Sequence, residues 1–285
     1  MYSSAILNDT LDSRKLIYKK QSPHQLIELY KTKNGEYWLA LNGVMQFHSL
    51  ECHKSHVPMV GFPAIFAENL GSILIIGGGD GFAAQEALKY PFKKIVNVEL
   101  DADLLNLTTN HPVMRKLTDD TFRNPRVKVI AGDGIRYLIS SKEKFDVIID
   151  DCEFDITGQS SLSKALYKQY ENCLVTKLTD GGVGSLMEPY EVLGDFDETP
   201  YLQAFKWYQD SIKGKRLNSK QERSVKQAMM AVQDSCDEDF KLCMYNWKNR
   251  APHIKSYREG FPKIGYESFI FFSKRPITAK RPLRS

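Results

Sequence analysis

The chain has 285 residues, of which 42% are hydrophobic, 26% charged and 11% aromatic. This composition is typical of a globular protein with a sizeable core and excludes a disordered, collagen-like or simple-repeat chain. The 39 Lys and Arg residues against 35 Asp and Glu give a formal net charge of +4, spread along the chain without a nucleic-acid-binding block. No apolar run has the length of a signal peptide or a membrane span. We therefore expect a soluble, cytoplasmic protein that binds neither nucleic acid nor membrane.

The N-terminal part of the chain predicts a small antiparallel β domain. Short strand-like stretches lie between residues 15 and 48. They are separated by the turn signals Ser22-Pro23, Asn34-Gly35 and Asn42-Gly43. Because Asn-Gly pairs adopt the tight turns that join neighbouring antiparallel strands, these stretches are expected to pair as hairpins. We assign residues 1–58 to this N-terminal β-strand domain.

From about residue 60 the pattern changes to apolar runs that alternate with helical stretches. The runs cover residues 72–77, 94–100, 126–132, 145–150 and 181–187, and a later strand covers 265–274. Such alternation predicts a parallel sheet with crossover helices. We assign residues 59–285 to an α/β domain with a Rossmann-like, doubly wound, mostly parallel sheet. It contains a polar helical excursion at about 193–251 and ends in a loose basic tail at 274–285.

The clearest local motif is a glycine-rich turn after the first of these strands. There Gly77, Gly78, Gly79 and Gly81 surround Asp80 and lead into a helix. Glycines let the backbone approach a ligand at the carboxyl end of a strand, where open α/β sheets bind their ligands. A tight turn without a ligand is the alternative, but an acid within four glycines is a poor choice for turning alone. The motif therefore predicts a nucleoside site.

Acidic residues follow at the ends of the next two strands. Glu99 lies about twenty residues after the glycines, where an acidic side chain accepts hydrogen bonds from a ribose diol. Asp133 and Gly134 follow the third strand, where the carboxylate is placed to bind an adenine amino group. Since Asp80 would repel a pyrophosphate, the pattern favours a nucleoside without phosphates that carries a positive charge, such as an adenosyl sulfonium compound.

The fourth strand ends in a group of acids, Asp150, Asp151, Glu153 and Asp155. Carboxylates beside one crevice bind a cationic substrate and raise one another's pKa, so that one can accept a proton near neutral pH. An acidic surface loop is the alternative, which the place of the loop in the topology disfavours.

At this point the chain resembles the polyamine aminopropyltransferases, the family of spermidine synthase. The resemblance covers residues from about 15 to 193 and from about 252 to 275. It rests on motifs in register: KKQSPHQ with Gln25, LNGVMQ with Gln46, GGGDG with Asp80, VELD with Glu99, GDG with Asp133, and FDVIIDD with Asp151.

The resemblance implies the two domains described above, assembled as a homodimer or homotetramer. It implies transfer of the aminopropyl group of decarboxylated S-adenosylmethionine to an amine such as putrescine, giving spermidine or a related polyamine and methylthioadenosine. This co-substrate is the only cofactor expected, with no prosthetic group and no metal. Nucleoside contacts are expected from Gln25, Gly78, Glu99, Asp133 and Gly134. Contacts to the aminopropyl arm or the amine are expected from Gln46, His56, Asp80 and Asp155, with Asp151 as the proton acceptor.

The chain departs from the family pattern on the acceptor side. Ser55 and Val57 flank His56 where the family has a Tyr and a polar residue. The loop after Asp151 is one residue longer than usual and lacks the family's proline. Phe261 stands where a Tyr of the family lines the diamine site. Because a site without polar partners discriminates weakly, we expect poor activity with putrescine and either a longer or bulkier amine acceptor or broad tolerance.

Two alternative functions are compatible with these motifs. One is an amine N-methyltransferase that uses S-adenosylmethionine itself, and the other is a non-catalytic relative that uses its helical excursion and basic tail as contact surfaces. Asp80 would repel the carboxylate of intact S-adenosylmethionine, and the presence of Asp151 argues against a lost activity. Aminopropyl transfer is therefore the favoured prediction.

Overall fold

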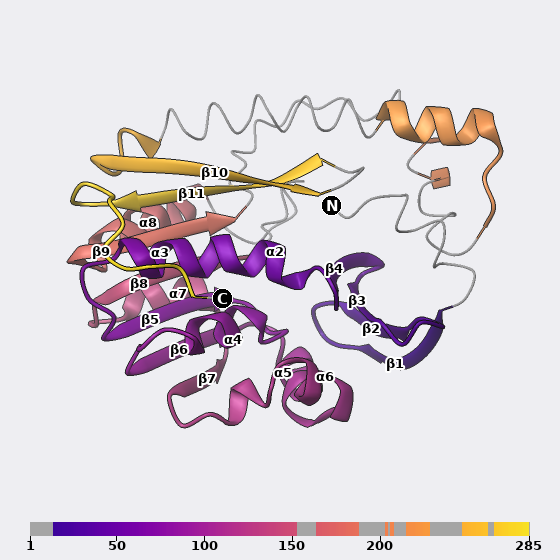
Figure 1. The fold of residues 1–285 in the computed structure, drawn as a ribbon, viewed down its shortest axis with the longest axis horizontal. Coiled ribbons are helices and arrows are strands. Elements are labelled where there is room, and N and C mark those ends of the chain that lie inside the picture. The colour runs from indigo at the N-terminus through magenta and orange to yellow at the C-terminus, as the bar shows by residue number, and fades with distance from the viewer. Residues whose placement is uncertain are drawn as a thin grey trace.

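The computed structural model describes residues 14–152, 164–187, 203–204, 206–207, 215–228, 247–261 and 265–284. These residues form a four-stranded sheet followed by a seven-stranded sheet with helices around it. Figure 1 shows the small sheet beside the larger one, next to the helices α5 and α6. None of the helices in the described part of the chain is both long and apolar enough to cross a membrane.

The small sheet has the antiparallel hairpin topology that the sequence predicts. Its strands pair in chain order: β1 (Lys15–Gln21), β2 (Leu26–Lys31), β3 (Tyr37–Leu41) and β4 (Val44–His48). The tight turn between β3 and β4 has positive φ at Asn42 (50°) and Gly43 (78°), as a two-residue hairpin requires. The buried face of this sheet carries Ile27, Leu29, Leu39 and Phe47.

A helical segment that the sequence did not predict connects the two sheets. It consists of α2 (Cys52–His56), a turn of π-helix η2 (Val57–Gly61) and α3 (Phe62–Phe66). Met59, Val60 and Ala64 are buried in the core of the larger sheet. The domain boundary expected at residue 58 falls inside this segment, and the division into two domains stays a prediction.

The larger sheet confirms the Rossmann-like prediction. Its strand order is β10-β11-β9-β8-β5-β6-β7. The bounds are β5 (Ser72–Gly77), β6 (Lys94–Glu99), β7 (Val127–Ala131), β8 (Phe145–Asp151), β9 (Leu178–Met187), β10 (His253–Phe261) and β11 (Gly265–Ser273). Strands β5 to β9 run parallel, and the β11–β9 and β10–β11 pairs are antiparallel. The carboxyl ends of β5, β6 and β8 therefore meet at one edge.

Helices cover both faces of this sheet. They are α4 (Phe82–Leu88), α5 (Ala102–Asn110), α6 (Pro112–Leu117), the short 3₁₀ helix η3 (Thr121–Arg123), α7 (Gly134–Ser140) and α8 (Lys164–Thr176). Helices α3 and α4 enclose one apolar cluster against the sheet, and α7 and α8 enclose a second cluster on the opposite face. Residues 219–228 of the expected helical excursion are also helical, while most of that excursion lies outside the described residues.

The prediction of a loose C-terminal tail is wrong. Ile277 is buried, and the Lys280 amide donates to the Ile65 carbonyl. The Arg281 guanidinium donates to the carbonyls of Ala64 and Ala67. These carbonyls at the end of α3 have no partner within the helix, and a guanidinium both hydrogen-bonds them and complements the negative end of the helix dipole. The basic residues of the tail therefore fix it to α3.

Candidate active site

The glycine-rich turn between β5 and α4 brings three strand ends together. Gly77, Gly78 and Gly81 have positive φ values of 84°, 66° and 89°. A Cβ on Gly77 would lie 2.2 Å from the backbone oxygen of Asp151, and a Cβ on Gly79 would lie 2.6 Å from Cγ of Glu99. The turn thus needs glycine both for its conformation and for its closeness to β6 and β8.

Side chains of the neighbouring elements hold the carbonyls of this turn. Asn97 Nδ2 on β6 donates to the Gly77 carbonyl at 2.7 Å, and Thr108 Oγ1 on α5 donates to the Gly79 carbonyl at 2.7 Å. Both bonds are buried, where hydrogen bonds are least exposed to competition from water. The turn is therefore fixed in place, as a preorganised binding site requires.

Glu99 ends β6 directly against this turn. Its Oε2 accepts a hydrogen bond from the Gly79 amide at 3.0 Å and its Oε1 accepts one from the Asp101 amide at 2.8 Å. Burial raises the pKa of Glu99, and the two amides lower it by less. Each carboxylate oxygen retains a lone pair beyond the one that its amide uses, so the oriented group can still accept from a diol.

Asp80 lies in this turn, and Asp151 lies against it at the end of β8. Asp80 Oδ1 accepts from the Phe82 amide in the first turn of α4 at 3.1 Å, and its charge contributes to the raised pKa of Glu99. Asp151 pairs with Gly77 across the sheet, and its Oδ2 lies 3.1 Å from the place of a Cβ on Gly78. The structure therefore brings the predicted residues Gly78, Asp80, Glu99 and Asp151 together.

Asp133 and Gly134 begin α7 at the end of β7. Asp133 caps the helix, since its Oδ1 accepts from the Arg136 amide at 3.0 Å, and its Oδ2 lies 3.2 Å from Arg136 Nε. A Cβ on Gly134 would lie 2.5 Å from Cγ2 of Ile76, so this glycine lets α7 approach β5. Both residues thus have structural roles, and their contact with adenine stays a prediction.

Gln25 binds Asp101, a residue that the sequence analysis did not single out and whose amide donates to Glu99. Gln25 Nε2 and Ser22 Oγ donate to Asp101 Oδ2 at 2.9 and 2.7 Å. Asp101 is only 1% exposed, and its Oδ1 caps α5 by accepting from the amides of Asp103 and Leu104. The signal for it was present, because an Asp between a strand and a helix is a typical N-cap.

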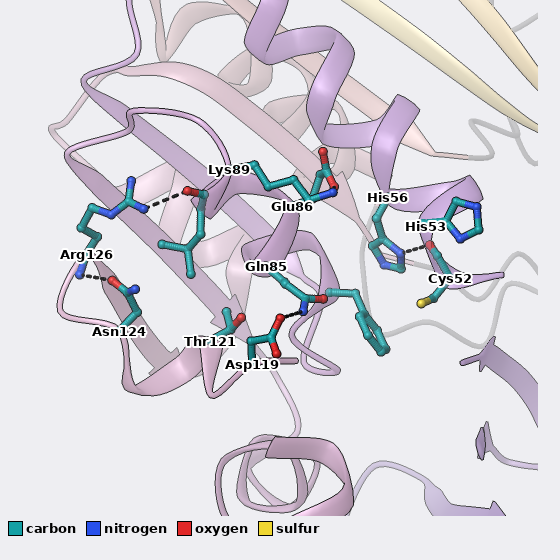
Figure 2. A pocket seen from close by; sticks show the side chains of 12 residues that line it. Cys52, His53, His56, Gln85, Glu86, Lys89, Asp119, Thr121, Asn124 and Arg126 are labelled. Atoms are coloured by element: carbon teal, nitrogen blue, oxygen red, sulfur yellow. Dashed lines mark hydrogen bonds and ion pairs between the residues drawn. The ribbon is translucent and has the colours of Figure 1, made fainter. Parts of the chain in front are cut away.

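His56 lines a pocket on the side of α4. Its Nδ1 lies 2.6 Å from the Cys52 carbonyl oxygen, and its ring lies 5.6 Å from that of Phe82. The pocket has a volume of about 500 Å³. Figure 2 shows His56 near one end and Arg126 near the other. Asp80, Glu99 and Asp151 do not line this pocket, but Cys52 does, and burial together with the nearby Asp80 carboxylate raises the pKa of its thiol.

The comparison with known proteins agrees with this geometry. Residues 53–190 match the family model of the spermine/spermidine synthase domain. This part of the chain is similar to that domain. The matched residues include Asp80, Glu99, Asp133 and Asp151, whereas Gln25 and Gln46 precede them.

Curated relatives of this domain are polyamine aminopropyltransferases. Polyamine aminopropyltransferase 2 of Aquifex aeolicus is 34% identical over 169 residues, which make up 59% of this chain and 34% of that protein. The polyamine aminopropyltransferase of Thermococcus onnurineus is 29% identical over 202 residues, 65% of this chain and 69% of that protein. The match spans about a third of the length of the relatives from Aquifex aeolicus and Leptospira interrogans.

Two solved structures share the fold of the domain and of the preceding sheet. Spermidine synthase from Thermotoga maritima superposes with a TM-score of 0.62 at 21% identity, covering 92% of this chain and 73% of that one. A spermidine synthase in complex with the transition-state analogue AdoDATO gives a TM-score of 0.64, covering 92% and 74%. Both confirm the predicted fold class.

The residues expected on the acceptor side lie partly within and partly outside the described part of the chain. Glu153 and Asp155 lie outside the described residues, so the role of Asp155 stays a prediction. Gln46 is half-buried on β4, Ser55 is buried on α2, and Phe261 ends β10. Among the residues that the structure describes, no group of three or more His, Cys, Asp or Glu side chains is arranged to hold a metal ion.

Proposed function

We propose that this protein is a polyamine aminopropyltransferase that moves the aminopropyl group of decarboxylated S-adenosylmethionine to an amine. The observation that carries the proposal is the convergence of Asp80, Glu99 and Asp151 on one fixed glycine turn within the part of the chain that matches the spermine/spermidine synthase domain. The resemblance to the family also supports a homodimer or homotetramer in the cytoplasm.

The donor site follows from the chemistry of these acids. Glu99 accepts hydrogen bonds from the ribose hydroxyls, with Gln25 and the backbone at Gly78 alongside, while Asp133 and Gly134 meet the adenine. Asp80 binds the ammonium group of the aminopropyl arm. It would repel the carboxylate of intact S-adenosylmethionine, so the turn favours the decarboxylated donor over the methyl donor.

Asp151 supplies the proton acceptor. Amines have pKa values of roughly 10, and only an amine nitrogen that has lost its proton carries a free lone pair. That lone pair attacks the aminopropyl carbon next to the sulfonium, forming a C–N bond, while the C–S electrons pass to sulfur. Methylthioadenosine leaves as a neutral thioether, and Asp151 takes the proton that the attacking nitrogen loses. The site thus orients two cations and removes one proton.

The acceptor is proposed to be an amine longer or bulkier than putrescine, or a range of amines. Gln46 and His56 are proposed to border the junction of the two substrates, and Asp155 to hold the far end of the acceptor. Ser55 and Phe261 replace two phenol hydroxyls that would otherwise bind an ammonium group. A site with fewer polar partners rejects alternative substrates less strongly.

Mass analysis of products tests the activity. The purified chain is given decarboxylated or intact S-adenosylmethionine with diamines of increasing length. We expect methylthioadenosine and an aminopropylated amine from the decarboxylated donor alone. Asp151→Asn should lower turnover about a hundredfold or more, because a general base contributes about 10²–10⁴-fold, while calorimetry shows unchanged affinity for methylthioadenosine. Glu143→Gln, which removes a carboxylate that pairs with Lys94 at the amino end of β6, is the control and should keep full turnover.

Other products would contradict this proposal. A methylated amine from intact S-adenosylmethionine would show the methyltransferase instead, and donor binding without any product would show a non-catalytic relative. Full turnover in Asp151→Asn would move the proton acceptor to Glu153 or Asp155. A sharp preference for putrescine with ordinary efficiency would refute the proposed acceptor class.

A further inference from the structure

The two acids that end β8 lie on opposite faces of the sheet. Side chains alternate along a strand, so Asp151 faces the glycine turn while Asp150 and Cys152 share the other face. Asp150 pairs with Ile76 of β5 and Leu186 of β9, and both of these residues belong to the apolar cluster under α7 and α8. The acid group that the sequence predicts at this edge is therefore divided, with Asp150 inside the protein.

The surroundings of Asp150 disfavour a negative charge. The residue is 6% exposed, and its Oδ1 has no hydrogen-bond partner among the described residues. The groups that act on its carboxyl are the Tyr170 side chain from α8 and Cys152 from its own strand, and neither carries a positive charge. Burial raises the pKa of Asp150 to about 7, which these two groups only partly counteract.

Asp146 on the same strand shows the opposite arrangement. It is also buried, at 8% exposed, but its Oδ2 accepts from the amides of Gly71 and Ser72 at 2.7 and 3.0 Å. Its Oδ1 accepts from Thr179 Oγ1 at 2.9 Å. Three donors thus satisfy both oxygens of this carboxylate. Asp146 therefore serves as a reference for Asp150. Both are buried on β8, but within the described part of the chain only Asp146 has hydrogen-bond donors at both carboxylate oxygens.

The two residues that follow Asp150 in the chain lie close to the glycine turn. A Cβ on Gly77 would lie 3.2 Å from the Cys152 Sγ and 2.2 Å from the Asp151 backbone oxygen. Residues 151 and 152 therefore lie directly against the turn. Tyr170 is fully buried and anchors α8 in the same cluster. Contacts that fix Asp150 and Cys152 on one face therefore fix the direction of Asp151 on the other.

We propose that Asp150 is a positioning residue that, while protonated, holds the end of β8 together with Tyr170 and Cys152 so that Asp151 faces the glycine turn. This inference rests on the proposed function, in which Asp151 takes the proton. Burial raises the pKa of the Cys152 thiol, and the charges of Asp150, Glu99 and Asp151 raise it further. Among the described residues, the cation next to this cluster is Arg250, which stacks on Trp247 and pairs with Glu171 of α8.

Urea unfolding across pH 5 to 8.5 tests the neutral acid without requiring activity. Because the pKa of Asp150 is higher in the folded than in the unfolded chain, the folded state binds more protons, and this contribution to stability is lost as the pH rises toward about 7. The wild-type urea midpoint should therefore fall over this range relative to that of Asp150→Asn. Asp146→Asn is the matched control: an amide cannot accept all three hydrogen bonds from Gly71, Ser72 and Thr179, so the midpoint should fall while the pH dependence of the wild type is kept.

Steady-state kinetics tests the positioning role. Asp150→Asn keeps a neutral polar group and should retain turnover of wild-type order, whereas Asp150→Ala should lower kcat about tenfold to a hundredfold without changing KM for the donor. An Asn variant with the wild-type pH dependence of unfolding, or a folded Ala variant with wild-type kcat, would overturn the inference. A wild-type chain that forms no product refutes the proposed function instead, and the unfolding experiment then decides whether Asp150 is neutral.

Discussion

At the scale of single residues, the Glu99 carboxylate is held in one orientation and also has a raised pKa. Its two backbone donors fix the plane of the carboxylate, and burial raises its pKa above that of an ordinary glutamate. Protonation removes acceptor capacity from this carboxylate, which is proposed to bind the ribose. Affinity for methylthioadenosine should therefore fall on acidification, and it should begin to fall at a higher pH than for an ordinary Glu.

Calorimetry of methylthioadenosine binding between pH 4.5 and 8 measures this effect. At pH 7.5, Glu99→Gln should weaken binding by roughly 1.5–3 kcal/mol, the value of a hydrogen bond to a charged group, and should remove the pH dependence. Glu143→Gln makes the same change at a residue that pairs with Lys94 at the amino end of β6, and it serves as control. Equal affinity of wild type and Glu99→Gln at both ends of the range would exclude Glu99 from the nucleoside site.

The sequence predicted where individual residues lie when the order of the parallel strands alone decides their place. Asp80, Glu99 and Asp151 follow parallel strands, whose carboxyl ends necessarily meet at one edge, so their convergence could be inferred. The role of Asp101 was missed because it depends on Ser22 and Gln25, which lie 79 and 76 residues away in the chain. The face on which Asp150 lies depends on the register of β8, and spacing cannot resolve one residue of register.

At the scale of elements, the approach of α7 to β5 depends on one glycine. A Cβ on Gly134 would lie 2.5 Å from Cγ2 of Ile76, which is fully buried in the middle layer and cannot move aside. Gly134→Ala should therefore lower the free energy of unfolding by about 1–3 kcal/mol, since overpacking outweighs the better helix propensity of Ala. Gly132→Ala, two residues earlier, meets nothing within 4 Å and should leave stability unchanged or slightly higher. Urea unfolding distinguishes them, and equal stability of the two variants would contradict the packing argument.

The parallel strands were predicted well because they are buried on both faces and therefore appear as continuous apolar runs. Strand β10 was missed for the opposite reason: its sequence HIKSYREGF alternates weakly, and it lies at the edge of the sheet, paired only with β11. The tail was misjudged because Arg281 acts through carbonyls of α3, more than two hundred residues away in the chain. Edge strands and long-range caps depend on tertiary contacts that local patterns do not encode.

At the scale of the whole molecule, the two sheets are joined by an apolar contact and a polar one. Phe47 of the small sheet packs edge-on against Phe82 of α4, with ring centroids 4.8 Å apart. Beside this contact, Ser22 and Gln25 bind the buried Asp101 at the start of α5. Because the neighbouring Glu99 accepts from the Asp101 amide, the small sheet is connected to the nucleoside site through one residue.

A double-mutant cycle between Gln25→Ala and Asp101→Ala tests this connection. Asp101→Ala should be the more destabilising single change, because it removes the α5 cap and the buried hydrogen bond from Ser22 Oγ. The coupling energy in urea unfolding should reach about 1–3 kcal/mol, as expected for a part-buried bond to a carboxylate. Gln21→Ala is the matched control, since the Gln21 side chain donates to the Ser22 carbonyl within its own domain, and its coupling to Asp101→Ala should be near zero. Absence of coupling for Gln25 would mean that its bond to Asp101 does not stabilise the fold, and that the small sheet is held by its other contacts, which include the apolar cluster around Phe47 and Phe82.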